Sequence, residues 1–224
     1  IYLYSATGEA AYLEAARRAG RFLTDRAWDS GAGTFPFEYS VDGDRVEPLA
    51  FFFDAGIIVR GLLALHRATR LPDLLRAAEA CGVSMARDFA AGREFHPSVS
   101  LPGKEPTPRE ARWSRNPGCY QLKAALGWWD LWEATGQPEF RAFYEQALAY
   151  ALETHAAFLP GEAQPERIMD RLHAYCYFLE GLLPAAGRAG CSQVLREGAE
   201  RASRLSDEIA PLFERSDTVA QLLR

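Results

Sequence analysis

The sequence has 224 residues, of which 48% are hydrophobic and 25% are charged, and this composition is typical of a globular domain with a sizeable core. Its formal net charge of −5 argues against general nucleic-acid binding. No apolar run approaches the about 18 residues that a membrane-spanning helix needs. We therefore expect a soluble protein whose partners include neither nucleic acid nor a membrane.

The four cysteines are spaced singly, without a Cys-x-x-Cys pair: Cys81, Cys119, Cys176 and Cys191. This spacing favours reduced thiols and a cytoplasmic location over a disulfide framework. The chain begins at Ile1 and ends inside a helical pattern. From this we expect a single domain over residues 1–224 that is part of a longer protein, with secretion as the alternative location.

Helical periodicity predicts eight helices. They cover residues 7–26, 51–69, 72–89, 119–134, 139–158, 169–186, 192–214 and a last stretch from 216. Two segments between them are not helical. Phe35, Phe37 and Tyr39 alternate as in a strand before a turn signal, which predicts a small β-hairpin near 34–47. Five prolines in residues 90–118 forbid a continuous helix there, and a loop this long is usually functional or disordered.

A repeat organises the helices, since an apolar helix followed by a polar-faced helix recurs at 51–89, 119–158 and 169–214. The pattern predicts two layers, in which the apolar helices lie inside and the amphipathic helices shield them from water. An open solenoid of hairpins is the alternative. In a ring, the loops that precede the inner helices share one rim, where we expect the binding site.

The predicted helix at 169–186 carries a polar stripe on an apolar background. At about 100° per residue, Asp170, His173, Tyr177 and Glu180 fall on one arc of this helix. A surface helix shows the opposite pattern, an apolar stripe among polar residues. We therefore expect this helix to be packed on most sides, with its polar face toward a wet cavity, and this favours the ring.

Inner helices of (α/α) toroids are similar to the stretch Asp54-Ala55-Gly56-x3-Arg60-Gly61-Leu62-Leu63-Ala64-Leu65-x2-Ala68-Thr69. Such toroids include six-hairpin glycosidases, glucuronyl C5-epimerase-like proteins and acylglucosamine epimerases. The resemblance implies an all-α fold, an (α/α) toroid-like array of helical hairpins, and activity on carbohydrates. A six-hairpin ring needs twelve helices, so the eight predicted here imply an incomplete or smaller ring. No catalytic motif of these families matches, and no catalytic role is transferred.

The candidate catalytic residues lie near the starts of inner helices or on the polar stripe: Asp54, Asp170, His173, Tyr177 and Glu180. Carboxylates beside a histidine or tyrosine can supply a general acid and base. Two carboxylates across a cavity could cleave a glycosidic bond, whereas tyrosine and histidine could remove and return a proton at a sugar carbon. The two reactions stay open at this point.

Each candidate also has a structural interpretation. The carboxylates of Asp54, Asp170 and Asp217 could cap helix N-termini, which carry partial positive charge. Glu180 lies in an apolar run and needs either a wet cavity or an ion pair, for which Lys123 and Arg60 are the candidate partners. His173 could be a core histidine that is satisfied by hydrogen bonds.

The candidate substrate-binding residues come from the 90–118 segment and the inner-helix starts: Arg109, Arg112, Trp113, Asn116, Tyr120, Lys123, Arg171 and Asp217. Arginine binds carboxylates through two parallel hydrogen bonds. Trp113 and the aromatic residues of 33–53 could stack on sugar rings. Together they suggest a saccharide that contains a uronic acid, while a solvated or protein-facing loop is the alternative.

A zinc site is a further alternative, with Cys119, His173 and Cys176 as ligands. Lanthionine-synthetase cyclases are toroids with such a ligand set, and Gly118-Cys119-Tyr120 faintly resembles their cysteine motif. Their adjacent Cys-His pair is absent from this sequence. Cysteines that fill small core spaces are therefore the expectation, and no cofactor is expected.

These patterns lead to one main functional hypothesis, a carbohydrate-active glycoside hydrolase, lyase or sugar epimerase. The alternatives are a glycan- or protein-binding helical array without catalysis, and a zinc-dependent cyclase. The expected ligand is a small molecule or an oligosaccharide. Oligomeric state stays open.

Overall fold

A computed structural model describes residues 1–38, 48–159, 164–210 and 212–223. The α-helices are α1 (Tyr2–Thr7), α2 (Ala10–Phe22), α3 (Phe52–Thr69), α4 (Pro72–Asp88), α5 (Leu122–Thr135), α6 (Pro138–Phe158), α7 (Pro165–Gly181), α8 (Ala189–Ile209) and α9 (Ser216–Leu222). The strands are β1 (Leu49–Phe51), β2 (Ala90–Ala91), β3 (Glu94–Phe95) and β4 (Ser98–Ser100). Short 3-10 turns cover Trp113–Arg115, Cys119–Gln121 and Leu183–Ala185.

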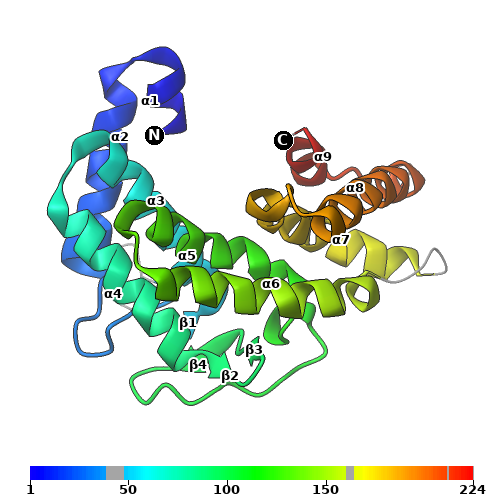
Figure 1. Cartoon of the computed structure of the whole chain (residues 1–224), viewed down its shortest axis with the longest axis horizontal. Helices are drawn as coiled ribbons and strands as arrows, with labels where there is room; N and C mark the ends of the chain where they lie inside the picture. Colours follow the sequence, from blue (N-terminus) through cyan, green and yellow to red (C-terminus); the bar gives the residue numbers. More distant parts are fainter. Residues whose placement is uncertain (39–47, 160–163, 211, 224) are drawn as a thin grey trace.

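The helices form consecutive hairpins in two layers, as the repeat predicts. The apolar helices α3, α5, α7 and α9 pack on one another in turn, and α4, α6 and α8 each pack against the inner helix before them. In Figure 1 the hairpins follow an open arc, with α1 and α9 at its two ends. Helix α7 packs against α5, α6, α8 and α9, which confirms that its apolar surface is covered on most sides.

Close backbone contacts bring the inner helices together. A Cβ atom added at Gly56 of α3 would lie 2.3 Å from the carbonyl oxygen of Ala124 in α5. A Cβ atom at Gly181 of α7 would lie 2.8 Å from the backbone of Leu122. Glycine therefore lets the three inner helices approach more closely than side chains would allow.

Large aromatic residues fill the space between the two layers, and their polar atoms are satisfied. The Trp128 Nε1 donates to the Gly82 carbonyl at 2.8 Å, which joins α5 to α4. The Tyr144 hydroxyl donates to the Gly181 carbonyl at 2.9 Å, which joins α6 to the end of α7. A buried aromatic with a hydrogen-bonded polar tip both packs and fixes orientation.

Several predicted boundaries are wrong. The helix predicted at 7–26 begins three residues late, as α2 at Ala10, and Gly8, with a φ of 75°, ends a separate short helix, α1, before it. Helix α7 begins at Pro165, four residues before the predicted start, since proline fits the first turn of a helix. Helix α8 ends at Ile209, before Pro211.

The predicted β-hairpin near 34–47 is not formed by the part that the structure describes. Thr34 makes a single bridge with Asp29, and the Phe37 amide donates to the Leu49 carbonyl at 2.8 Å. The predicted turn and second strand, at 39–47, lie outside the described residues. Instead, β1 pairs antiparallel with β4. The 90–118 segment, predicted to be irregular, also contains the antiparallel pair of β2 and β3.

The 90–118 segment is fixed to the helices by side-chain contacts. Lys104 forms an ion pair with Asp88 at the end of α4. The Gln121 amide donates to the Phe95 carbonyl at 3.1 Å. No helix of the described residues is long and apolar enough to cross a membrane.

Candidate functional site

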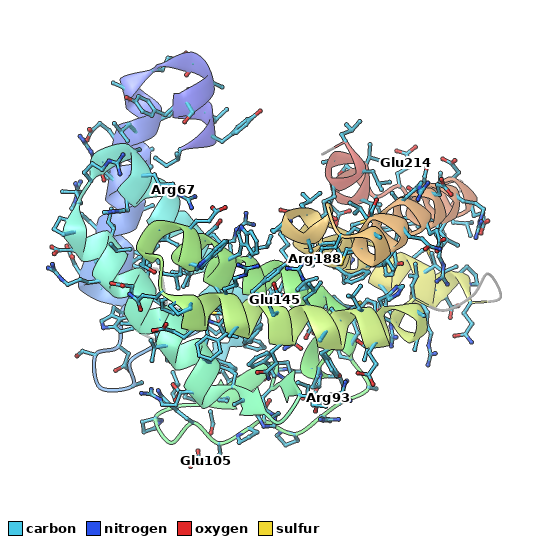
Figure 2. The ribbon with its side chains drawn as sticks, in the orientation of Figure 1. Arg67, Arg93, Glu105, Glu145, Arg188 and Glu214 are labelled. Atoms are coloured by element: carbon cyan, nitrogen blue, oxygen red, sulfur yellow. The ribbon has the colours of Figure 1, made fainter. Side chains whose placement is uncertain are left out.

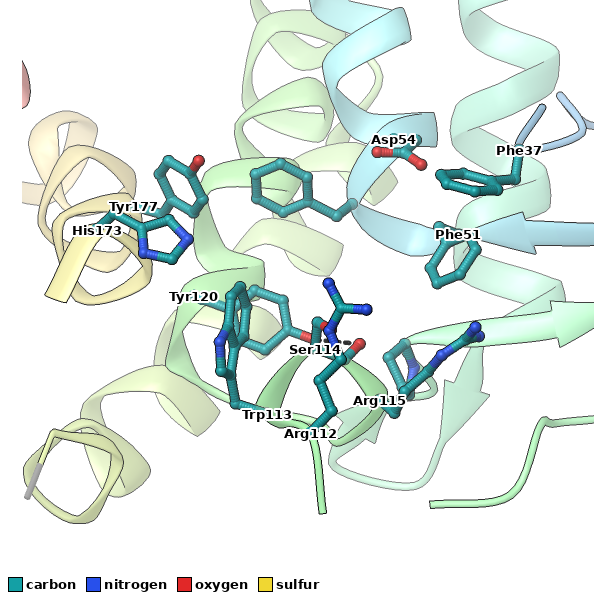
Figure 3. A pocket seen from close by; sticks show the side chains of 12 residues that line it. Phe37, Phe51, Asp54, Arg112, Trp113, Ser114, Arg115, Tyr120, His173 and Tyr177 are labelled. Carbon is teal, nitrogen blue, oxygen red and sulfur yellow. Dashed lines mark hydrogen bonds between the residues drawn. The ribbon is translucent and has the colours of Figure 1, made fainter. Parts of the chain in front are cut away.

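A cavity of about 500 Å³ lies where three parts of the chain meet. The start of α3, the turn at Trp113–Arg115 and the side of α7 form its walls (Figure 3). Its lining residues are Phe37, Phe51, Phe53, Asp54, Pro97, Arg112, Trp113, Ser114, Arg115, Tyr120, His173 and Tyr177. The cavity thus combines aromatic surfaces with a few charged or titratable groups, which is typical of a small-molecule site.

Asp54 supplies the one carboxylate among the described residues that line the cavity. It lies in the first turn of α3, where a negative charge suits the helix dipole. Its carboxylate has no hydrogen bond or ion pair with any described residue, so it does not act as a hydrogen-bonding cap. Burial raises the pKa of Asp54.

His173 lies on α7, on the opposite side of the cavity from Asp54 (Figure 3). Its Nδ1 atom is buried and has no hydrogen-bond partner among the described residues. Burial, and then the charge of Arg215, lower the pKa of His173, while Asp217 and Asp170 act in the opposite direction. The imidazole is therefore neutral at pH 7 and can accept a proton.

Aromatic side chains form the surface between these two groups. The rings of Trp113 and His173 meet edge to face, with centroids 5.4 Å apart, and Trp113 meets Tyr120 at 4.9 Å. Trp113 Nε1 donates to the Asp170 Oδ1 at 3.1 Å. Asp170, a predicted catalytic residue, thus lies beside the cavity and holds the tryptophan ring.

Tyr177 lines the cavity next to His173, with ring centroids 5.5 Å apart. The Phe53 ring lies 5.1 Å from it. The Lys123 Nζ lies 4.3 Å from the centre of the Tyr177 ring, a cation–π contact from outside the cavity. Burial raises the pKa of Tyr177, so its hydroxyl stays protonated at neutral pH.

Glu180 lies elsewhere, although it shares the polar stripe with His173. It does not line this cavity. Its Oε2 lies 3.0 Å from the Lys123 Nζ and its Oε1 lies 3.6 Å from the Arg60 Nη1. Arg60 in turn donates to Asp130 at 3.0 Å. The structure thus shows the ion pairs that the sequence offered as the alternative for Glu180.

Five predicted binding residues also lie outside the lining of the cavity, and Lys123, the ion-pair partner of Glu180, is one of them. Arg109 pairs with Glu94, and the Asn116 amide donates to the carbonyls of Glu110 and Arg112. Arg171 donates to the Phe158 carbonyl at 3.0 Å. Asp217 pairs with Arg215 and accepts a hydrogen bond from the Thr218 amide within the first turn of α9, whose cap residue is Arg215.

The zinc ligand set is not assembled in the part of the chain that the structure describes. There, no group of three or more His, Cys, Asp or Glu side chains could hold a metal ion. Burial raises the pKa of Cys176 to about 12 and also raises that of Cys119, so both thiols stay protonated at neutral pH. All four cysteines are free and buried, as predicted for small core residues.

Three lining residues were not assigned to the site from sequence: Pro97, Ser114 and Arg115. Ser114 and Arg115 share one turn with Arg112 and Trp113. Their position next to these two candidates is the feature of the sequence that could have placed them in the site. Pro97 gave no signal, because only the pairing of β4 with β1 brings it to the start of α3. Its carbonyl accepts the Phe52 amide at 3.0 Å.

Known proteins were compared with this chain in sequence and in structure. No family model and no curated protein matches the sequence. A cellobiose 2-epimerase from Spirochaeta thermophila superposes with a TM-score of 0.72 at 17% identity, over 92% of this chain and 57% of that one. A sugar epimerase from a ruminal bacterium gives 0.68 at 11% identity, over 96% and 58%. A D-mannose isomerase gives 0.58 at 14% identity, over 91% and 52%.

The chain has the (α/α) toroid fold. This confirms the resemblance expected from the inner-helix pattern. The chain spans a little over half the length of the toroids that it matches. In Figure 1 successive hairpins lie side by side along an arc that does not close into a ring.

Proposed function

We propose that this toroid chain contributes the sugar site of an epimerase or isomerase, which moves a proton at a sugar carbon. The observation that supports this most is the pair of groups across the cavity, a neutral imidazole at His173 and a carboxylate at Asp54 that no described residue pairs with. The three solved toroids above are named as sugar epimerases or isomerases. Because their sequence identities are low, these structures support only the fold, and the proposal rests on the geometry of the cavity.

The same geometry favours proton transfer over glycoside hydrolysis. Hydrolysis commonly uses two carboxylates that face each other across the scissile bond. Here Asp54 faces His173, and within the described ranges no second carboxylate lines the cavity. Asp170 is engaged with Trp113, and Glu180 with Lys123. A hydrolase or lyase is therefore the weaker candidate.

In the proposed reaction, the aromatic walls bind the sugar and the two polar groups exchange protons with it. His173 takes the proton from the carbon beside the carbonyl of the open-chain sugar, which leaves an enediolate. Asp54, whose pKa is raised toward neutrality, exchanges a proton with a sugar oxygen on the other side. If the enediolate turns its other face to His173, return of the proton to the same carbon gives an epimer. Return of the proton to the neighbouring carbon gives an isomer.

A solvent-exchange experiment tests this reaction directly. We expect incubation with cellobiose or mannose in D2O to place deuterium at sugar C2, detected by NMR. Replacing His173 with glutamine should slow the exchange by about 100-fold or more, because the base is lost. His66→Gln is the matched control, since His66 lies toward the other end of α3, where its Nδ1 contacts the Leu71 carbonyl at 2.8 Å. Sugar binding without exchange would assign the cavity to a non-catalytic glycan-binding protein.

The rate should depend on pH through His173. The base acts only when it is neutral, so kcat/KM should be lost as the pH falls through the pKa of His173. Because burial lowers that pKa below the ordinary 6.5, the acidic limb should lie below this value. The limb should disappear in the His173→Gln variant. A limb well above pH 6.5 would contradict the assignment of His173 as the base.

A further inference from the structure

We infer that the sugar bound in this cavity carries a carboxylate, which Arg112 recognises. The inference rests on the proposed function and names its substrate class. Two arginines, Arg112 and Arg115, line the cavity, against the single carboxylate of Asp54 among the described residues. The lining therefore has one net positive charge, in a chain whose formal net charge is −5. A concentrated charge of the opposite sign is what a site for an anion requires.

The two arginines differ in what already occupies them. Arg115 donates to the Ser98 Oγ at 3.3 Å, lies 4.0 Å from Glu110, and stacks over the Phe51 ring at 4.8 Å. The guanidinium of Arg112 has no hydrogen bond or ion pair with any residue in the described ranges. Arg115 is thus a fixed part of the wall, whereas no described residue occupies the donors of Arg112, which can bind a ligand.

The backbone of Arg112 is nevertheless held in place. Its carbonyl accepts hydrogen bonds from the Arg115 amide at 3.1 Å and from the Asn116 side chain at 2.9 Å. The backbone N–H of Asn116 donates to the Trp113 carbonyl at 3.0 Å. The loop that presents the guanidinium is therefore ordered before a ligand binds, which lowers the entropy cost of binding.

The neighbouring side chain supplies the second contact that a sugar acid needs. Trp113 follows Arg112 in the same turn, and its ring meets His173 at 5.4 Å. In Figure 3 the Arg112 side chain extends into the cavity between the Trp113 ring and Asp54. A sugar ring stacked on Trp113 can thus direct its carboxylate to Arg112 while its carbon atoms face His173.

A carboxylate fits this lining better than a phosphate. Both anions bind arginine through two parallel hydrogen bonds. A phosphate monoester carries close to two negative charges at pH 7. Its second charge exceeds the net positive charge of the lining and adds repulsion from Asp54. A uronic acid carries one negative charge and balances the lining.

Binding of matched sugars tests the inference. The probes are cellobiose, the disaccharide of glucuronic acid and glucose with the same linkage, and glucose 6-phosphate, measured by calorimetry at low and at physiological salt. We expect the acidic disaccharide to bind at least about tenfold more tightly than cellobiose. Arg112→Gln should remove this preference, because it should weaken binding of the acidic disaccharide at least about tenfold more than binding of cellobiose. Arg109→Gln, in the same segment but paired with Glu94 outside the cavity, should leave the binding of both sugars unchanged.

The outcomes separate this inference from the proposed function. Equal binding of cellobiose and the acidic disaccharide would overturn the inference and leave the sugar site standing. So would an equal loss of both sugars in Arg112→Gln, which would indicate a structural role for the arginine. Tighter binding of glucose 6-phosphate than of the acidic disaccharide would overturn the choice of a carboxylate. Binding of none of the three would contradict the proposed function itself.

Discussion

Replacing Gly56 with alanine is expected to destabilise the protein by about 3 kcal/mol, because the new methyl group would overlap the backbone of Ala124. It would lie 2.3 Å from the carbonyl oxygen and 2.7 Å from the Cα atom of Ala124. Backbone atoms of a packed helix cannot rotate away as a side chain can. Helices α3 and α5 would have to separate, and Asp54, two residues away, would move with α3. Urea unfolding followed by circular dichroism measures the change.

The same helix provides the control. Gly61 is exposed, and a Cβ atom there would meet nothing within 4 Å. Alanine at this position should therefore stabilise α3 by about 0.5–1 kcal/mol through its better helix propensity. If Gly56→Ala unfolds at the same urea concentration as the unchanged protein, the close crossing of α3 and α5 is wrong.

Replacing Glu180 with alanine is expected to cost about 3 kcal/mol, because it leaves buried positive charge without a partner. Glu180 is 8% exposed, and the side chain of Lys123 is 17% exposed. Without the carboxylate, Lys123 and Arg60 would repel each other across the inner layer. Lys123 would also lose the partner that holds it over the Tyr177 ring. Thermal and urea unfolding measure the loss.

A surface ion pair is the matched control for Glu180. Glu145 and Arg188 join α6 to the start of α8, with side chains 34% and 43% exposed (Figure 2). Glu145→Ala should cost less than about 1 kcal/mol, because water replaces most of the interaction. Adding Lys123→Met to Glu180→Ala should recover part of the stability, since the unpaired charge is then removed. A loss in Glu180→Ala no larger than that in Glu145→Ala would show that the inner pair is effectively solvated.

The hairpin fold could be predicted because its signal is repeated. Each inner helix is apolar on most faces, whereas each outer helix is apolar on one face. The need to bury apolar faces therefore decides which helices lie inside and which lie outside. The boundaries depended on single residues. Helix α7 starts earlier than predicted, at Pro165, and Gly8 separates α1 from α2. The pairing of β1 with β4 joins segments about 50 residues apart, which no local pattern specifies.

The candidate site could be predicted only in part, because sequence periodicity reports direction and not depth. His173 and Glu180 point along the same face of α7, yet seven residues place them about 10 Å apart along the helix axis. One therefore lies beside the cavity and the other in the ion-pair cluster. Arg109 and Arg112 are three residues apart in a segment without helical phase, so only the turn at Trp113–Arg115 decides which faces inward.

The 90–118 segment is joined to the rest of the chain by contacts of its own, such as Lys104 with Asp88 and Phe95 with Gln121. The groups proposed to exchange protons lie on α3 and α7, whereas the groups proposed to select the sugar lie on this one segment. In the proposed enzyme, the groups that move the proton and the groups that select the sugar would therefore belong to different parts of the chain. Replacing Arg112 and Ser114 in the turn between Glu110 and Asn116, with Trp113 kept beside His173, should change the sugar that is bound and leave α3 and α7 unchanged.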